Sequence, residues 1–367
     1  MRIIISGGGT GGHVYPAIAI ANALKEKGVK EILFVGARGK IEMEKVPKAG
    51  YQIQGLDIQG FHRTRKWRNI LFPLRLIKSM WRAKKIIEKF GPDVAVGVGG
   101  YASGPLLKMA QRKKIPTVIQ EQNSYPGITN KLLAKGASRI FVAYNGMEKF
   151  FSASKLVKSG NPVRKDLIEI DNLKSEAVNH FGLDESKKTI LIFGGSLGAR
   201  SINKAVAAQE ELIKSLDDVQ FIWQVGKIYH DEYKNNSALA NLKHVTVLPF
   251  IDRMDYAYSV ADVIVSRAGA LTISELTLVG KPSLLVPSPN VAEDHQTKNA
   301  MALVNEDAAW LVKDKEASET MINRALELLL DPIAQQRLST NLRQLAKPNA
   351  REEIADEILK LGSNATQ

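Results

Sequence analysis

Short apolar runs alternate with amphipathic stretches along the whole 367-residue chain. The first run, Ile3-Ile4-Ile5, is β-branched and predicts a buried strand. A helix expected over 17–27 then places its apolar residues along one stripe: Ala17, Ile20, Ala21 and Leu24. Alternation of this kind is typical of parallel sheets with crossover helices, so the pattern predicts an α/β fold.

Two series of strands are expected, one in each half of the chain. The first comprises 2–5, 31–35, 52–58, 93–97, 116–120 and 139–143, and the second comprises 189–193, 220–225, 245–248, 262–265 and 283–286. The turn-rich segment 159–164 between them suits a hinge. We therefore expect two doubly wound, Rossmann-like domains, one over 1–160 and one over 161–345. A helix at about 346–361 is expected to pack back on the first domain.

Residues 6–16 read SGGGTGGHVYP and connect the first strand to the first helix. Ligands of open α/β sheets bind at such strand-to-helix turns, where glycine lets the backbone approach a phosphate or sugar closely. The Gly-x-Gly-x-x-Gly pattern would also suit a dinucleotide. That interpretation needs an acidic residue about 20 residues later, but the second strand runs into Gly36-Ala37-Arg38. A tight turn without a ligand is the other interpretation.

Composition excludes several classes of site. The chain has no cysteine, so disulfides, thiolate nucleophiles and cysteine metal sites are ruled out, and a reducing compartment is favoured. No run of about 18 apolar residues exists that could cross a membrane. The first residues show no pattern of a signal peptide.

The net charge of +13 is unevenly distributed. Residues 1–165 contain 30 Lys and Arg against 9 Asp and Glu, whereas the remainder contains 21 against 29. A basic half joined to an acidic half predicts that one half meets a polyanion, either a nucleic acid or an anionic membrane.

Much of the positive charge lies in residues 63–90, interleaved with large apolar residues. On a helix, two stripes form side by side, an apolar one at 70, 74, 77 and 81 and a basic one at 75, 78, 82, 85 and 89. Basic residues beside tryptophan and leucine suit a helix in a membrane interface. A core helix with a solvated basic face is the alternative. RNA binding is disfavoured because few of these side chains offer a stacking face.

Further polar and glycine-rich segments follow other predicted strands. They are 97–105, 121–131, 194–203, 267–275 and 293–299. Because the carboxyl ends of parallel strands share one edge of a sheet, these segments are expected to converge on one cleft.

Together with the opening loop, these segments resemble the MurG family, the UDP-N-acetylglucosamine–lipid I N-acetylglucosaminyltransferases of peptidoglycan synthesis. The motifs that carry the resemblance are GGGTGGHVYPA, GVGGYASGP, EQNSYPGITNK, SGNPVR, GGSLGARSIN, SRAGALTISEL and EDHQTKNA. They occur in the family's order and span nearly the whole chain. The resemblance implies a GT-B fold, in which two Rossmann-like domains face each other across a cleft.

The same resemblance implies an inverting transfer of N-acetylglucosamine from UDP-GlcNAc. The acceptor would be the muramoyl 4-hydroxyl of undecaprenyl-diphospho-MurNAc-peptide (lipid I), and the product lipid II. No cofactor or metal is obligatory, although the acidic residues at 252–255 are noted. The basic stretch 63–90 would hold the first domain on the anionic, cytoplasmic face of the bacterial inner membrane. No nucleic acid partner is expected.

Candidate donor-binding residues lie mostly in the second half. Ser196 and the amides at Ala270, Leu271 and Thr272 precede or begin helices and can face the diphosphate. Glu275 is placed to accept from both ribose hydroxyls, or else to form a capping box with Thr272. The resemblance adds Ile251 for uracil, Gln296 and Asn123 for the sugar hydroxyls, Arg164 for the nucleotide charge, and Ile273 and Ser274. A loop-stabilising hydrogen bond is the alternative for either amide.

The opening loop supplies the candidates for chemistry. Thr10, Gly11 and Gly12 would hold a substrate diphosphate, and the resemblance makes His13 the candidate general base. A loop histidine that bonds backbone or phosphate is the alternative. Competing functions are another GT-B glycolipid glycosyltransferase, a dehydrogenase, and an RNA-binding protein with salt-dependent affinity.

Overall fold

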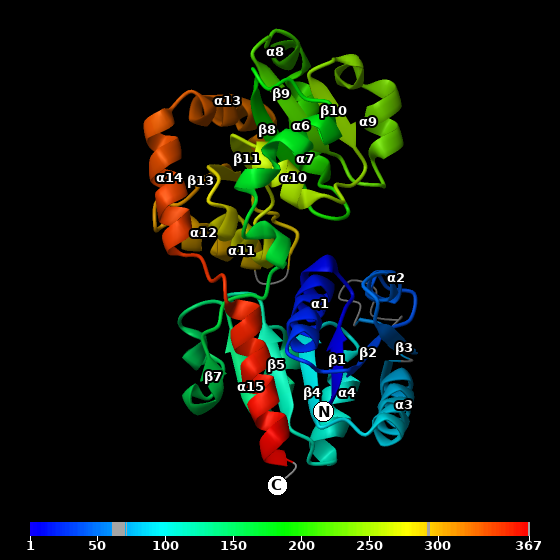
Figure 1. The fold of residues 1–367 in the computed structure, drawn as a ribbon. Coiled ribbons are helices and arrows are strands. Elements are labelled where there is room, and N and C mark those ends of the chain that lie inside the picture. The colour runs from blue at the N-terminus through cyan, green and yellow to red at the C-terminus, as the bar shows by residue number, and fades with distance from the viewer. Residues whose placement is uncertain (61–69, 71, 292–293, 366–367) are drawn as a thin grey trace. The chain divides into compact units, whose positions relative to one another are not determined.

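The computed structural model describes residues 1–60, 70, 72–291 and 294–365. The chain forms two compact units, each of which is described by itself (Figure 1). Unit 1 contains Met1–Arg164 and Lys347–Gln367, and unit 2 contains Lys165–Ala346.

Unit 1 is built on a seven-stranded sheet of order β3-β2-β1-β4-β5-β6-β7, in which every pair is parallel. Its strands are β1 (Arg2–Gly7), β2 (Glu31–Ala37), β3 (Gln52–Leu56), β4 (Val94–Gly99), β5 (Thr117–Glu121), β6 (Arg139–Val142) and β7 (Leu156–Val157). The order reverses direction at β1, whose neighbours are β2 and β4. Ligands of doubly wound sheets bind at this switch point.

Helices cover both faces of the unit 1 sheet. They are α1 (Gly11–Glu26), α2 (Glu42–Lys48), α3 (Phe72–Phe90), α4 (Ser103–Arg112), α5 (Ile128–Ala134) and α15 (Ala350–Ala365). Because alternate strand residues point to opposite faces, Ile3 and Ile5 pack with α1 and α15, whereas Ile4 packs with α3 and α4. The C-terminal helix is also tied to the end of α1 by an ion pair of 2.8 Å between Arg351 and Glu26.

Unit 2 repeats the plan with a six-stranded parallel sheet of order β10-β9-β8-β11-β12-β13. The strands are β8 (Lys188–Phe193), β9 (Val219–Gln224), β10 (Val245–Leu248), β11 (Val263–Ser266), β12 (Ser283–Leu285) and β13 (Trp310–Leu311). The helices are α6 (Lys174–Phe181), α7 (Arg200–Ala208), α8 (Glu210–Lys214), α9 (His230–Asn236), α10 (Met254–Val260), α11 (Ala270–Val279), α12 (His295–Val304), α13 (Ala317–Leu329) and α14 (Pro332–Gln344).

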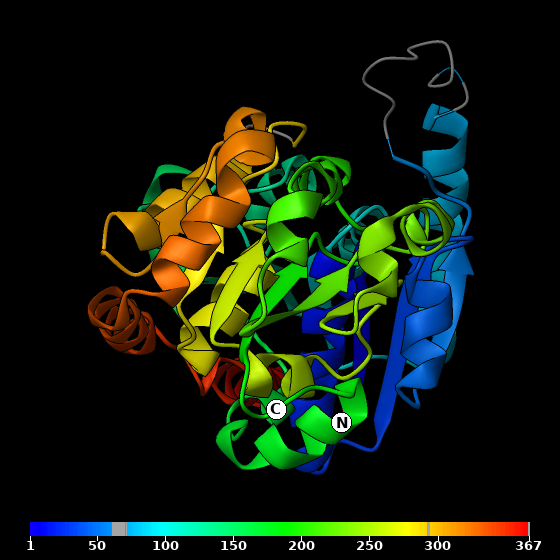
Figure 2. The same ribbon diagram turned by 90° about the horizontal axis from the view of Figure 1, so that it is seen from above.

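The unit 2 sheet also has two buried faces. Ile190 and Ile192 of β8 pack with α7 and α13, while Leu191 and Phe193 pack with α10 and α11. Figure 2 shows α13, in orange, lying across the strands of this sheet. These buried faces explain why the strands are nearly continuous apolar runs.

The structure confirms the predicted α/β fold with two parallel sheets. All eleven expected strands are present, and their ends differ by at most two residues. Two strands were missed, β7 and β13, because two residues are too few to show a pattern. No helix in the described part of the chain is long and apolar enough to span a membrane.

One helix boundary was predicted wrongly. Helix α1 begins at Gly11 rather than at 17, so Gly11, Gly12 and His13 form its first turn. Thr10 is extended and acts as the N-cap, and its carbonyl accepts from the amides of His13 and Val14. The low helix propensity of glycine, with a proline at position 16, hid this turn in the sequence.

Candidate functional site

The first glycine loop lies between β1 and α1, above a buried carboxylate. Glu42 is only 1% exposed. Its Oε2 accepts from the Gly9 amide at 2.8 Å and its Oε1 from the Ala37 amide at 2.9 Å. A Cβ atom at Gly8 would overlap this carboxylate, so the close approach requires glycine there. Glu42 was not predicted as a site residue, and its only signal is an acid in the first helical turn after β2.

The first turn of α1 presents backbone amides to whatever approaches the loop. Thr10 and Gly12 are exposed, and Gly11 is half-buried. The Thr10 side chain does not cap the helix. Amides at a helix N-terminus attract anions, so these three residues are suited to a diphosphate.

His13 occupies the third position of α1 and is half-buried. Its Nδ1 lies 2.9 Å from Oε1 of Gln122, which follows β5. The ring packs on Gly99 at the end of β4, where a Cβ would lie 2.7 Å from Nδ1. The His13 side chain is therefore bonded to a side-chain amide, which differs from the backbone bond of the alternative interpretation.

The β4–α4 loop holds the first glycine loop in place. The Gly8 amide donates to the Gly99 carbonyl at 3.3 Å. The buried Ser103 hydroxyl lies 2.8 Å from the same carbonyl and 3.0 Å from that of Ser6. Tyr101 is 45% exposed on this loop. The ends of β1, β4 and β5 thus bring His13 and the candidate diphosphate residues together in unit 1.

Asn123 is held by Glu121, the last residue of β5. The Glu121 carboxylate is buried; its Oε1 accepts from the backbone and side-chain amides of Asn123 at 3.0 and 3.2 Å. Its Oε2 accepts from the Gly127 amide and from Asn130 Nδ2 at 3.0 and 2.8 Å. The loop bond of the alternative interpretation is therefore present, and it leaves Oδ1 of Asn123 as the group that can meet a sugar hydroxyl.

Arg164 is half-buried and is the last residue of unit 1 before the chain enters unit 2.

In unit 2, the loop between β8 and α7 carries Ser196, which is half-buried. The neighbouring Gly195 carbonyl accepts from Gln224 Nε2, at the end of β9, at 2.9 Å. No hydrogen bond joins the Ser196 hydroxyl to another described residue. The loop is therefore anchored at Gly195, next to Ser196.

Helix α11 carries the densest group of predicted residues. It begins at Ala270 with Gly269 as N-cap, so the cap offers no side chain to the first-turn amides. Ile273 is buried in the core. Ser274 donates to the Ala270 carbonyl at 3.1 Å. Leu271 is half-buried in the same turn.

Glu275 is half-buried one turn into α11 and accepts from the Tyr258 hydroxyl at 2.9 Å. The capping-box alternative is wrong because Thr272 lies inside the helix and does not cap it. Tyr258 thus orients the Glu275 carboxylate, an acceptor-only group that can take more than one hydrogen bond.

Ile251 follows β10, and its side chain is buried among Tyr256 and Ile273 in the core. Its backbone makes no hydrogen bond to another described residue, so the peptide groups are available to a base edge. Nearby, Asp255 is bound by Arg253, with Oδ2 at 2.6 Å from Nη2. The described residues contain no group of three or more acidic or histidine side chains that could hold a metal.

Gln296 is the second residue of α12, and its Oε1 accepts from the Ser288 amide at 2.8 Å. Gln296 thus makes the loop-stabilising hydrogen bond that was the alternative to sugar binding. Its Nε2 remains as a donor. Residue 293, the first of the last quoted motif, lies outside the described residues.

An ion pair that sequence reasoning missed fixes the end of β11. Arg267 lies 2.5 Å from Asp314 and donates to the Ser201 hydroxyl on α7. Asp314 is 113 positions from Ser201, so no local pattern could reveal it. The pair ties the strand before α11 to the first turn of α7.

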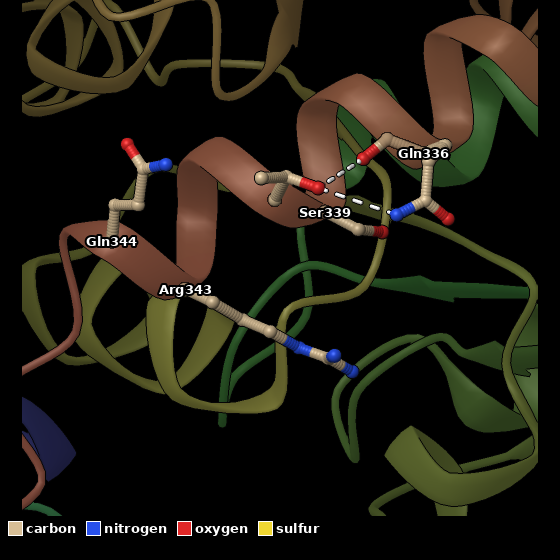
Figure 3. A pocket seen from close by; sticks show the side chains of 5 residues that line it. Gln336, Ser339, Arg343 and Gln344 are labelled. Atoms are coloured by element: carbon tan, nitrogen blue, oxygen red, sulfur yellow. Dashed lines mark hydrogen bonds between the residues drawn. The ribbon is translucent and has the colours of Figure 1, made fainter.

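A surface hollow on α14 is unrelated to these residues (Figure 3). It is lined by Gln336, Ser339, Thr340, Arg343 and Gln344. Gln336 Nε2 and Thr340 are bonded to each other at 3.3 Å. All its lining side chains come from one helix, and none is a predicted site residue.

Known proteins match both units. Residues 3–142 match the glycosyltransferase family 28 N-terminal domain, and residues 189–358 match the glycosyltransferase family 28 C-terminal domain. A Bacteroides fragilis protein is 54% identical over 367 residues, covering 100% of this chain and 97% of its own. A Parabacteroides distasonis protein is 55% identical over 362 residues, covering 98% of each. Both are UDP-N-acetylglucosamine–N-acetylmuramyl-(pentapeptide) pyrophosphoryl-undecaprenol N-acetylglucosamine transferases.

Among solved structures, MurG of Acinetobacter baumannii matches with a TM-score of 0.75 at 29% identity, covering 98% of this chain and 99% of its own. A UDP-GlcNAc 2-epimerase from Neisseria meningitidis matches at 16% identity with a TM-score of 0.69, covering 98% of this chain and 100% of its own. The second likeness concerns the fold alone.

Proposed function

The chain belongs to the MurG family within glycosyltransferase family 28, and on that premise we infer the reaction that it catalyses. It moves N-acetylglucosamine from UDP-GlcNAc to the muramoyl 4-hydroxyl of lipid I, and so forms lipid II for peptidoglycan synthesis. The observation that carries this conclusion is identity of 54% to a named relative over the full length of the chain.

Unit 2 is proposed to bind the donor. The Ile251 backbone would meet uracil, and Glu275, oriented by Tyr258, would accept from the ribose hydroxyls. Ser196 and the start of α11, from Ala270 to Thr272, would face the diphosphate. Ile273 fixes α11 in the core and Ser274 lies beside Glu275 in the same helix. Gln296 would donate to the sugar through Nε2.

Unit 1 is proposed to bind the acceptor and to start the chemistry. Thr10, Gly11 and Gly12 would hold the acceptor diphosphate at the N-terminus of α1. His13 would take the proton of the 4-hydroxyl as general base, which is typically worth about 10²–10⁴-fold in rate. Asn123 Oδ1 would accept from a sugar hydroxyl.

The transfer inverts the sugar in one displacement. The acceptor oxygen bonds to C1 while the bond from C1 to the donor phosphate breaks, and the electron pair leaves with UDP. Helix N-termini in unit 2 and the charge of Arg164 would stabilise that leaving group. His13 then releases the proton to solvent.

A membrane contact is proposed for α3 and for Ile70, which precedes it in the sequence. On α3, Leu74, Ile77 and Trp81 follow a helical spacing and are 58–65% exposed. Ile70, outside the helix, is 75% exposed. The core-helix alternative does not explain this exposure. Lys85 Nζ lies 3.6 Å from the centre of the Trp81 ring. This surface suits an anionic interface, on the cytoplasmic face where lipid I presents its headgroup. Residues 63–69 and 71 of the basic stretch lie outside the described residues.

The experiment that tests the function is UDP release from UDP-GlcNAc with and without a short-chain lipid I analogue. We expect release only with the analogue. UDP release with other glycolipids but not with the lipid I analogue would favour another GT-B glycosyltransferase.

A further inference from the structure

We propose that Gln122 is a positioning residue that fixes the tautomer of His13. It holds the proton of the neutral imidazole on Nδ1, so that Nε2 carries the lone pair that accepts the acceptor's hydroxyl proton. The proposal rests on the proposed role of His13 as general base. It assigns a task to an amide that the sequence motif contains but that the resemblance left without one.

The side-chain amide of Gln122 can take only one orientation. It is buried, with 1% exposure, at the end of β5. Its nitrogen Nε2 faces oxygens alone: the carbonyls of Val98 at 2.7 Å and Gln120 at 3.2 Å, and the side-chain Oε1 of Gln120. A reversed amide would set its own oxygen against these acceptors. Oε1 therefore points to His13, 2.9 Å from Nδ1.

The orientation is enforced by two further buried amides. Gln120 Nε2 donates to Asn161 Oδ1 at 2.9 Å, and Asn161 Nδ2 donates to the Gln122 carbonyl at 3.1 Å. Gln120 and Asn161 are 0% and 2% exposed. Because each amide commits its nitrogen to a neighbour's oxygen, the series has one polarity. It ends at Gln122 Oε1, which can only accept.

An acceptor at Nδ1 requires a proton there. The His13 ring also packs on Gly99, where even a Cβ would collide with it, which limits other ring positions. With Nδ1–H donating to Gln122, the neutral imidazole has an unprotonated Nε2. Nε2 is the nitrogen on the far side of the ring from this buried amide series.

The orienting group is uncharged. Titratable residues near the loops around His13 include Glu42, Glu121 and Tyr101. Glu42 accepts from the Gly9 and Ala37 amides. Glu121 accepts from the amides of residues 123 and 127, and Tyr101 lies beside Gly9. A carboxylate at position 122 would stabilise the protonated imidazole, whereas an amide orients the ring without doing so.

The direct test is the ¹⁵N NMR spectrum of histidine-labelled wild-type protein, with the His13 signals assigned by their loss in His13→Gln. Above the acidic limb of the activity profile, we expect a protonated Nδ1 and an unprotonated Nε2. The opposite tautomer, or a mixture of the two, would overturn the proposal. This measurement needs no altered Gln122.

Kinetics supply a second test. Gln122→Glu should move the acidic limb of the pH–kcat profile to higher pH, by about one unit or more. Gln122→Met should lower kcat by about tenfold or more, with the KM for UDP-GlcNAc within about twofold of wild type. A matched control is Gln111→Met, since Gln111 also donates to buried oxygens but lies at the far end of α4. It should leave the profile unchanged.

The outcomes separate this proposal from the one on which it rests. If His13→Ala keeps wild-type kcat, the base assignment itself fails. If His13→Ala loses activity but Gln122→Glu and Gln122→Met keep both the wild-type profile and kcat, Gln122 has no positioning role.

Discussion

Glu42 lies beneath the first glycine loop with each carboxylate oxygen bound to a main-chain amide. Among the described residues it forms no ion pair, so its charge is balanced by backbone amides alone. Hydrogen bonds to ionised acceptors are about twice as strong as neutral ones. Glu42 therefore fixes the end of β2 and the path of the chain into α1 from a buried position.

Removing one of these bonds should loosen the loop. In Glu42→Gln, the side-chain NH2 group faces a backbone N–H, so two donors meet where one hydrogen bond was made. We expect this to lower the free energy of unfolding by about 1–3 kcal/mol. We expect a lower free energy of unfolding in urea and a higher KM for the acceptor. The affinity for UDP should stay unchanged, because its proposed site lies in unit 2. An unaltered acceptor KM would show that Glu42 serves stability alone.

In unit 2, Glu275 is the carboxylate whose removal tests donor binding. Glu275→Ala should raise the KM for UDP-GlcNAc by about tenfold or more, since bonds to a charged group are worth about 1.5–3 kcal/mol. Tyr258→Phe, which removes only the hydroxyl that orients Glu275, should raise it less. The ribose assignment is refuted if Glu275→Ala binds the donor as wild type does.

At the scale of elements, the start of α10 is fixed by a charge pair. Burial acts to raise the pKa of Asp255, but the hydrogen bonds and charge of Arg253 outweigh it and hold that pKa below its ordinary value. Asp255 also lies in the first turn of α10, where a negative charge meets the helix dipole favourably. The loop that carries Ile251 leads directly into this turn.

This pair gives a pH dependence with a defined sign. A carboxylate with a depressed folded-state pKa contributes stability above its unfolded pKa, about 3.9, and loses it as the pH falls through the folded value. Asp255→Asn should therefore unfold at a lower temperature than wild type at pH 7. The difference should shrink below about pH 4. A difference that is constant from pH 7 to pH 3 would contradict the role of the charge.

Elements that repeat a buried pattern were predictable from the sequence, and elements set by distant partners were not. The run Ile3-Ile4-Ile5 predicts β1 because both faces of the sheet are covered, so that consecutive residues of the strand are apolar. The first turn of α1 escaped prediction because its stability comes from packing and from Glu42 rather than from glycine's propensity. The glycine loops and Glu275 were visible at strand ends. The amide series was not, because Gln120 and Asn161 are 41 positions apart.

At the scale of the whole molecule, the basic and acidic halves of the sequence correspond largely to unit 1 and unit 2. The basic half forms most of unit 1, which also carries the exposed stripe of α3. An anionic surface attracts each nearby basic residue by about 1 kcal/mol. We therefore propose that unit 1 makes the membrane contact.

Charge reversal tests this attribution. Changing Arg75, Lys78, Arg82 and Lys85 to glutamate should weaken binding to anionic vesicles by at least about 100-fold. Turnover of a short-chain acceptor should stay near wild type. The control makes the same change in net charge on exposed lysines of unit 2: Lys227, Lys234, Lys243 and Lys313. Equal vesicle binding by both variants would remove the membrane role of α3.

The most direct test of the central claim follows the sugar itself. Radiolabelled N-acetylglucosamine is supplied as UDP-GlcNAc together with a short-chain lipid I analogue, or with the same analogue lacking the muramoyl 4-hydroxyl. We predict label in a β-linked disaccharide product with the first acceptor and none with the second. Label transferred equally to the 4-deoxy analogue, or released only as free sugar, would contradict the assigned reaction.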